Sequence, residues 1–115
     1  MAKRRMFSIE IVESDAFCIM KASAQMLYFH LNMNADDDGI IDKWKSILRY
    51  LRVKREHLDS LIDAGYVIEL DCGALLISDW LIHNKIRQDR YTQGRYSYDL
   101  DALQILPSGR YTKGL

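Results

Sequence analysis

The sequence predicts a mainly α-helical domain with a small β-hairpin, of the winged helix-turn-helix class. Apolar residues recur at helical spacing in three segments, 23 to 33, 43 to 51 and 55 to 64, and two β-rich runs follow them. The second and third segments are separated only by the short turn 52 to 54. Helix, helix, short turn, helix and hairpin is the order of winged helix-turn-helix domains, which present the third helix to the major groove of DNA.

Composition indicates a single soluble domain. The chain has 115 residues, of which 49% are hydrophobic and 28% charged, a balance that suits one modest core. Its apolar runs are too short to span a membrane, and no signal-peptide pattern follows the basic start. Cys18 and Cys72 lack the CxxC spacing of metal or redox sites. We therefore expect a protein of a reducing compartment, the cytoplasm.

The first expected elements are two helices of unequal length. Ser14 precedes an aspartate and favours a helix N-cap, which predicts a short helical turn over 15 to 19. Ser23 is expected to cap the helix 23 to 33, whose apolar residues follow the i, i+3, i+4, i+7 pattern. One face of this second helix should therefore be buried.

The stretch NADDDGIIDKWK, 34 to 45, has the rhythm of a calcium-binding loop, with alternating oxygen-bearing side chains and a glycine in the sixth position. Such a loop needs a bidentate glutamate at its twelfth position, where this chain has Lys45, and no second loop of this kind occurs. We therefore expect a polar turn between two helices, in which the aspartates 36 to 38 cap and anchor the chain. No metal and no cofactor are expected.

The remaining elements follow from turn residues and β-rich runs. A short extended link at Ile40 and Ile41 leads into the second core helix, and Gly65 is expected to stop the third. The runs 66 to 70 and 74 to 80, separated by Asp-Cys-Gly, predict a hairpin. Trp44 and Trp80 are expected in the core.

The C-terminal part is expected to be less regular. Residues 82 to 90 have amphipathic helical character, and glycines and one proline punctuate the end of the chain. The predicted organisation is a winged-helix DNA-binding domain over 1 to 92, followed by a polar tail or the start of a linker over 93 to 115.

Charge is segregated along the chain although 16 basic and 16 acidic residues cancel. A neutral protein with segregated charge can present a basic face to nucleic acid, but charge runs can also be ordinary solvated helix surfaces. The third helix carries carboxylates on its exposed side, so it cannot lie flat along phosphates and must enter a groove by its N-terminus. The candidates for phosphate contacts are Lys43, Lys45, Arg49 and Arg52, those for base readout are Lys54, Arg55, His57 and Ser60, and those flanking them are Lys85, Arg87 and Arg90.

Four stretches of the sequence carry a family resemblance: KRRMFSIEIVESDAF, SAQMLYFHLNMNADDDGII, LIDAGYVIEL and HNKIRQDRY. Over residues 3 to about 92 this combination resembles the N-terminal domain of phage replisome organisers, replication initiation proteins of phages and prophages of Gram-positive bacteria that are related to DnaD-type primosome proteins. The resemblance implies a winged helix that binds double-stranded origin DNA and helps to recruit a helicase or its loader. It also implies a homo-oligomer, and it makes the ADDDG stretch a connector between helices.

Two departures from the family pattern limit this resemblance. Family members usually continue into a linker and a C-terminal domain, so we expect either an excised DNA-binding domain or a short relative. Lys21 and Ala22 stand where the family often has a proline before the Ser-Ala-Gln helix.

Several alternatives to origin binding stay open. They are a phage transcription regulator, a protein-interaction or oligomerisation module without DNA affinity, and a short inhibitor of a host nucleic-acid machine. Single-stranded DNA is a second candidate ligand, because tyrosines alternate with arginines over 87 to 98. An enzyme is not expected, since the chain has no Gly-rich phosphate loop, zinc spacing or nucleophile motif.

Overall fold

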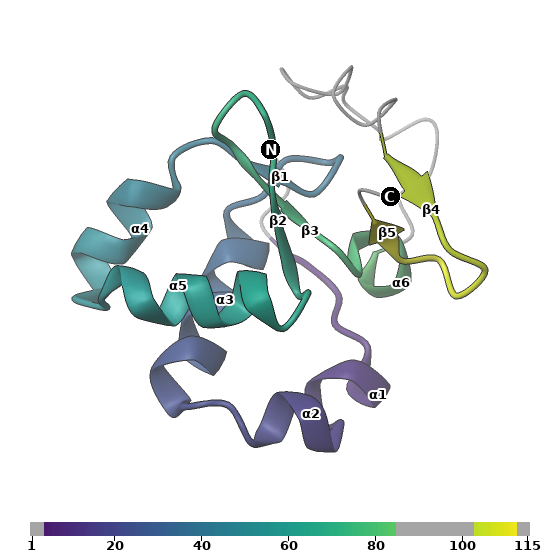
Figure 1. Ribbon diagram of the computed structural model, residues 1–115, viewed down its shortest axis with the longest axis horizontal. Helices are drawn as coiled ribbons and strands as arrows, with labels where there is room; N and C mark the ends of the chain where they lie inside the picture. Colours follow the sequence, from purple (N-terminus) through teal and green to yellow (C-terminus); the bar gives the residue numbers. More distant parts are fainter. Residues whose placement is uncertain (1–3, 85–102, 113–115) are drawn as a thin grey trace.

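The computed structural model describes residues 4–84 and 103–112, which form a mixed α/β fold with small antiparallel sheets (Figure 1). The helices of this part are α1 (Ile9–Val12), α2 (Asp15–Cys18), α3 (Ala22–Met33), α4 (Trp44–Leu51), α5 (Arg55–Asp63) and α6 (Trp80–His83). The strands are β1 (Ile40–Ile41), β2 (Val67–Glu69), β3 (Leu75–Ile77), β4 (Gln104–Ile105) and β5 (Tyr111–Thr112). None of these helices is both long and apolar enough to cross a membrane.

The predicted helices α2, α4 and α5 are confirmed to within a residue at each end, but the predicted cap of α3 is wrong. Ser23 lies inside α3, and the N-cap is Lys21, whose side chain makes no capping hydrogen bond. The amide of Gln25 explains the earlier start, because it donates to the carbonyls of Cys18 (3.2 Å) and Met20 (2.8 Å). This side chain fastens the first turn of α3 to the end of α2.

Three short strands form one sheet in the order β1-β3-β2. The predicted hairpin is confirmed as β2 and β3, in which Ile68 is opposite Leu76. The segment expected only as an extended link is a third strand, because Ile40 is opposite Leu76 on the other side of β3. The chain between α3 and α4 is therefore joined to the hairpin through backbone pairing.

The core lies between this sheet and helices α3, α4 and α5, which pack on one another. At its centre the rings of Phe17, Tyr28 and Tyr66 meet edge to face, with centroids 5.0 to 5.9 Å apart. Trp44 and Trp80 are both buried, as predicted. Edge-to-face packing of this kind adds to the burial of large apolar rings and fixes how the helices cross.

The end of the described chain closes back on the domain. Strands β4 and β5 form a second hairpin beside α6 (Figure 1). Tyr111 is buried and donates its amide to the Ser78 carbonyl (2.9 Å), while Arg110 pairs with Asp79 (3.2 Å) and donates to the Gly65 carbonyl. The sequence had indicated only a polar tail for this segment. The predicted helix over 82 to 90 is described only as far as α6, and its remainder lies outside the described residues.

The ADDDG stretch is a turn, as predicted. The Asp36 carboxylate accepts the amides of Asp38 (2.9 Å) and Ile40 (3.0 Å), a local arrangement that aspartate favours in turns. Burial raises the pKa of Asp36. Gly39 closes the turn with φ +85°, a backbone conformation that glycine adopts at little cost.

His83 on α6 anchors the N-terminal segment from inside the fold. Its Nδ1 accepts the Ser8 amide (2.8 Å), so the neutral ring carries its proton on Nε2, which lies 2.6 Å from the Tyr28 hydroxyl. Beside it, the Asn84 side-chain oxygen accepts the Met6 amide (2.9 Å). The ring is only 4% exposed, and burial lowers its pKa from 6.5 to about 4.

We therefore expect the protein to lose stability as pH falls from 7 toward 4. In this window His83 takes up a proton in the unfolded chain but not in the native state. The free energy of unfolding should therefore fall by about 2 kcal/mol between roughly pH 7 and pH 5. Urea unfolding at a series of pH values measures this slope. His83→Gln should flatten it, and an unchanged slope in that variant would assign the effect to other groups.

Candidate nucleic-acid interface

The exposed face of α4 carries most of the predicted phosphate contacts. Helical spacing places Lys45 beside Arg49 on one stripe, and Lys43, at the N-cap, above Tyr50 on the next. All four side chains are exposed, while Trp44 and Ile47 are buried, and the Lys45 ammonium lies 5.5 Å from the centre of the Trp44 ring. The amphipathic pattern of α4 therefore turns an apolar face to the core and a cationic one to solvent, where it can meet phosphates without breaking any core contact.

Arg52 occupies an unusual backbone position directly after α4. Its φ of +59° and ψ of 39° are left-handed, a conformation that glycine usually supplies at the end of a helix. The amide of Val53 donates to the Leu48 carbonyl (3.1 Å), which completes the helix-ending motif. A non-glycine residue here costs about 1 to 2 kcal/mol. Arg52 lies in the turn between α4 and α5. Because its strained backbone lowers stability, this arginine is a candidate for a functional role.

Arg55, predicted to read bases, also makes contacts within the protein. Its Nε lies 3.0 Å from Asp59 and its Nη2 lies 3.4 Å from Glu69 on β2. The guanidinium also stacks 4.8 Å from the centre of the Trp44 ring. These contacts join α4, α5 and β2 and use part of the planar fork that would bind a guanine edge, but the side chain is 47% exposed, so base readout by Arg55 stays a prediction.

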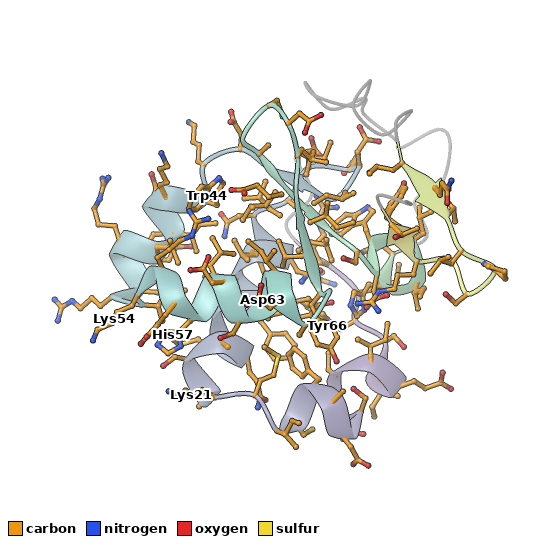
Figure 2. The ribbon with its side chains drawn as sticks, viewed as in Figure 1. Lys21, Trp44, Lys54, His57, Asp63 and Tyr66 are labelled. Carbon is orange, nitrogen blue, oxygen red and sulfur yellow. The ribbon has the colours of Figure 1, made fainter. Side chains whose placement is uncertain are left out.

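The other predicted base-reading residues lie at the N-cap and in the first two turns of α5. Lys54, labelled in Figure 2, is exposed at the N-cap of α5, two residues after Arg52 in the sequence. The Ser60 hydroxyl donates to the Glu56 carbonyl (3.0 Å), and the His57 side chain is only 14% exposed. Lys54 thus follows the cations of α4 directly in the chain and is exposed, whereas the His57 side chain is mostly covered and the Ser60 hydroxyl is bonded within α5.

The exposed face of α5 is acidic, as the sequence indicated. Glu56, Asp59 and Asp63 are all exposed along it. Carboxylates repel phosphates, so this face cannot follow a nucleic-acid backbone. The cationic surface therefore consists of α4 and the turn 52–54. The exposed face of α5 is not part of it.

Lys85, Arg87 and Arg90, predicted to flank the interface, lie outside the described residues, as do the tyrosines near 91 to 98.

Two structurally important residues were missed by sequence reasoning. His83 is buried, and Arg5 is an ion-pair partner whose side chain is only 3% exposed. The apolar run Trp-Leu-Ile before His83 was the available signal for its burial. Within the described ranges no group of three or more His, Cys, Asp or Glu side chains is placed to hold a metal ion.

Comparison of the chain with protein-family models, with curated proteins and with solved structures returns no significant match.

Proposed function

We propose that this chain is a winged-helix domain that binds double-stranded DNA through α4 and the turn that follows it. The element order α3, β1, α4, α5, β2, β3 with sheet order β1-β3-β2 supports this assignment, because winged helices combine a helix-turn-helix with a small three-stranded sheet. The single observation that carries DNA binding is the set of exposed cations on this surface, Lys43, Lys45, Arg49, Arg52 and Lys54.

The biological role that fits best is replication initiation in the cytoplasm of a phage-infected or lysogenic bacterium. The resemblance of the four sequence stretches to replisome organisers supports it. In that role the domain binds an origin repeat as an oligomer and helps to recruit a helicase or its loader. It is a binding protein and not an enzyme, with α4 making the phosphate contacts and Lys54 at the groove.

A protein-interaction module without DNA affinity is the second candidate. The acidic outer face of α5 favours it, since a helix in this position usually carries the base contacts. A phage transcription regulator would share the DNA surface and differ in the sequence it binds.

Fluorescence anisotropy with a duplex from the gene's own replication region, a scrambled duplex and a single strand tests the proposal. We expect preference for the cognate duplex and a steep loss of affinity with salt. Arg52→Ala with Lys54→Ala should weaken duplex binding at least about tenfold and lower the log-log salt slope by about 0.9 per lost contact. Arg4→Ala with Lys21→Ala removes the same charge elsewhere and should change affinity little. Equal affinity in the two double variants would refute this surface.

Arg52→Gly separates function from stability at one position. Glycine relieves the left-handed strain, so the free energy of unfolding should stay equal or rise by up to about 1 kcal/mol. Duplex affinity should fall, because the guanidinium is lost. Urea unfolding and anisotropy on the same sample measure both, and a variant that is less stable and binds normally would show Arg52 to be structural.

A further inference from the structure

Strand β2 is the open edge of the three-stranded sheet, whose order is β1-β3-β2. The Leu70 amide donates to the Ala74 carbonyl (2.9 Å), so positions 68 and 70 are the ones that bond toward β3. Because bonding directions alternate along a strand, the N–H and C=O groups of Val67 and Glu69 point outward. No backbone hydrogen bond engages these groups within residues 4–84 and 103–112. Such an edge is a template for another extended chain.

A groove of about 430 Å³ follows this open edge, between α5, β2 and the β4–β5 hairpin. Three consecutive residues of β2, 67–69, line it, together with Ile62 of α5 and with Leu106 and Tyr111 of the hairpin. A hollow over one face of a strand is lined by alternate residues, because successive side chains point to opposite faces. The run of three therefore indicates that the groove opens onto the edge of β2 and its backbone.

A buried hydroxyl without a partner belongs to the same groove. Ser78 lines the groove and is 0% exposed, and within the described part of the chain its Oγ makes no hydrogen bond. Both backbone groups of Ser78 are engaged, the amide with the Tyr66 carbonyl and the carbonyl with the Tyr111 amide. Native structures seldom leave a buried hydroxyl unpaired, so this one marks a place where a bound polar group can supply the missing bond.

The charges at the border of the groove are already paired within the chain. Glu69 lies 3.4 Å from Arg55, and Arg110 lies 3.2 Å from Asp79. The exposed side chain between them is apolar, since Leu106 is 42% exposed. A nucleic acid needs unpaired cations, whereas an uncharged extended peptide needs an open strand edge and apolar walls. The groove has the second set of features.

We propose that this groove binds an extended, uncharged segment of another protein, which adds to the sheet as a strand beside β2. Backbone hydrogen bonds to Val67 and Glu69 hold the segment, an apolar side chain of it packs against Leu106, and a polar group of it reaches Ser78. The site is separate from the proposed DNA surface, because none of its lining residues belongs to α4 or the turn 52–54. Figure 1 shows α4 and the β4–β5 hairpin at opposite sides of the view.

A selection from random seven-residue peptides displayed on phage, with the full chain as target, tests the proposal. Glu69→Pro is the counter-target, because proline removes the outward N–H and is tolerated on an edge strand. Peptides enriched on the wild type over this variant should be uncharged and rich in β-branched residues. In fluorescence anisotropy such a peptide should bind the wild type at least about tenfold more tightly than the variant. A selection that enriches no peptide, or only charged ones, overturns the proposal.

Glu69→Ala separates the backbone from the side chain at this position. It removes the same exposed carboxylate and keeps the N–H, so the selected peptide should bind it within about twofold of the wild type. Thermal unfolding checks that both variants at position 69 are folded. Equal losses of affinity in the two variants would assign binding to the carboxylate and overturn strand addition.

The hairpin wall provides a second pair of variants that does not depend on the proline. Leu106→Ser changes an exposed residue of the groove and should weaken peptide binding about tenfold. Ile105→Ser changes the neighbouring residue, which is 57% exposed and does not line the groove, and should leave peptide affinity unchanged. Equal effects of the two substitutions would move the site away from the groove and overturn the proposal.

Hydrogen exchange of the Glu69 amide reports the new backbone bond. The selected peptide should slow this exchange at least about tenfold. Slow exchange that needs no peptide and depends on protein concentration would give the edge to a second copy of the chain and overturn the proposal. The proposed function is tested separately, because Leu106→Ser should leave duplex affinity unchanged. A wild-type protein that binds the peptide and no duplex refutes only the proposed function.

Discussion

Gly39→Ala is expected to destabilise the fold by roughly 3 to 5 kcal/mol, which is a large part of the stability of a domain of this size. Two penalties combine at this position. The backbone has φ +85°, which strains any side chain, and an added Cβ would lie 2.7 Å from Cδ2 and 2.8 Å from Cβ of Trp80. Trp80 is 1% exposed and donates its indole N–H to the Asp37 carbonyl (3.0 Å), so it has no room to move aside.

Chemical unfolding measures this loss, and Gly73→Ala is the matched control. Gly73 has nearly the same backbone, with φ +92°, but an added Cβ there meets nothing within 4 Å. The control variant should therefore lose only about 1 to 2 kcal/mol, from strain alone. Equal losses in the two variants would mean that the approach of Trp80 to the turn contributes nothing.

Arg5→Met is expected to cost roughly 3 to 5 kcal/mol, because it removes one partner of a buried ion pair. The Arg5 and Asp37 side chains are 3% and 13% exposed and lie 3.2 Å apart. Arg5 also donates to the Ala35 carbonyl (2.6 Å) and its guanidinium stacks 4.9 Å from the centre of the Trp80 ring. Methionine keeps much of the stem and the burial, so the measured loss reports the charge and its hydrogen bonds.

A double-mutant cycle with Asp37→Asn isolates the pair. If the ion pair is the cause, the double variant should be more stable than the sum of the single losses predicts, by at least about 1 kcal/mol. Strict additivity would assign the effect of Arg5 to its stacking on Trp80 and its bond to Ala35. Urea unfolding of the four proteins at one pH provides the comparison.

Periodicity and turn residues predicted the helices and the hairpin, because these elements are set by neighbours in sequence. The capping serine at position 14, the glycine at 65 and the apolar spacing of α3, α4 and α5 are all local signals. Strand β1 could not be recognised as a strand from two isoleucines, since its pairing partner is more than thirty residues away. Helix α1 was also missed, because Ile-Glu-Ile-Val favours an extended chain by local preference.

The candidate site was predictable to the level of the helix that carries it and no further. Exposed positions of α4 follow from its amphipathic spacing, so Lys45 and Arg49 were expected on the surface where they lie. The contacts that Arg55 makes with Trp44 and Glu69 were not predictable, because these partners come from other elements. Its i, i+4 spacing to Asp59 was a usable sign of an internal ion pair. Arg5 gave no such sign, since a charge run at a chain start usually indicates exposure.

The hydrogen bonds that His83 and Asn84 make to the backbone of residues 6 to 8 also bear on how the domain is made. They join positions 75 and 78 residues apart, so they cannot form until almost all of the described core has left the ribosome. The segment 6 to 8 is synthesised long before its partners and is therefore among the last parts of the domain to dock, since it has no place to bind until α6 emerges. A truncation just before α6 and a deletion of the first eight residues should both remove this connection, although the truncation also removes the buried side chains of Trp80 and Tyr111.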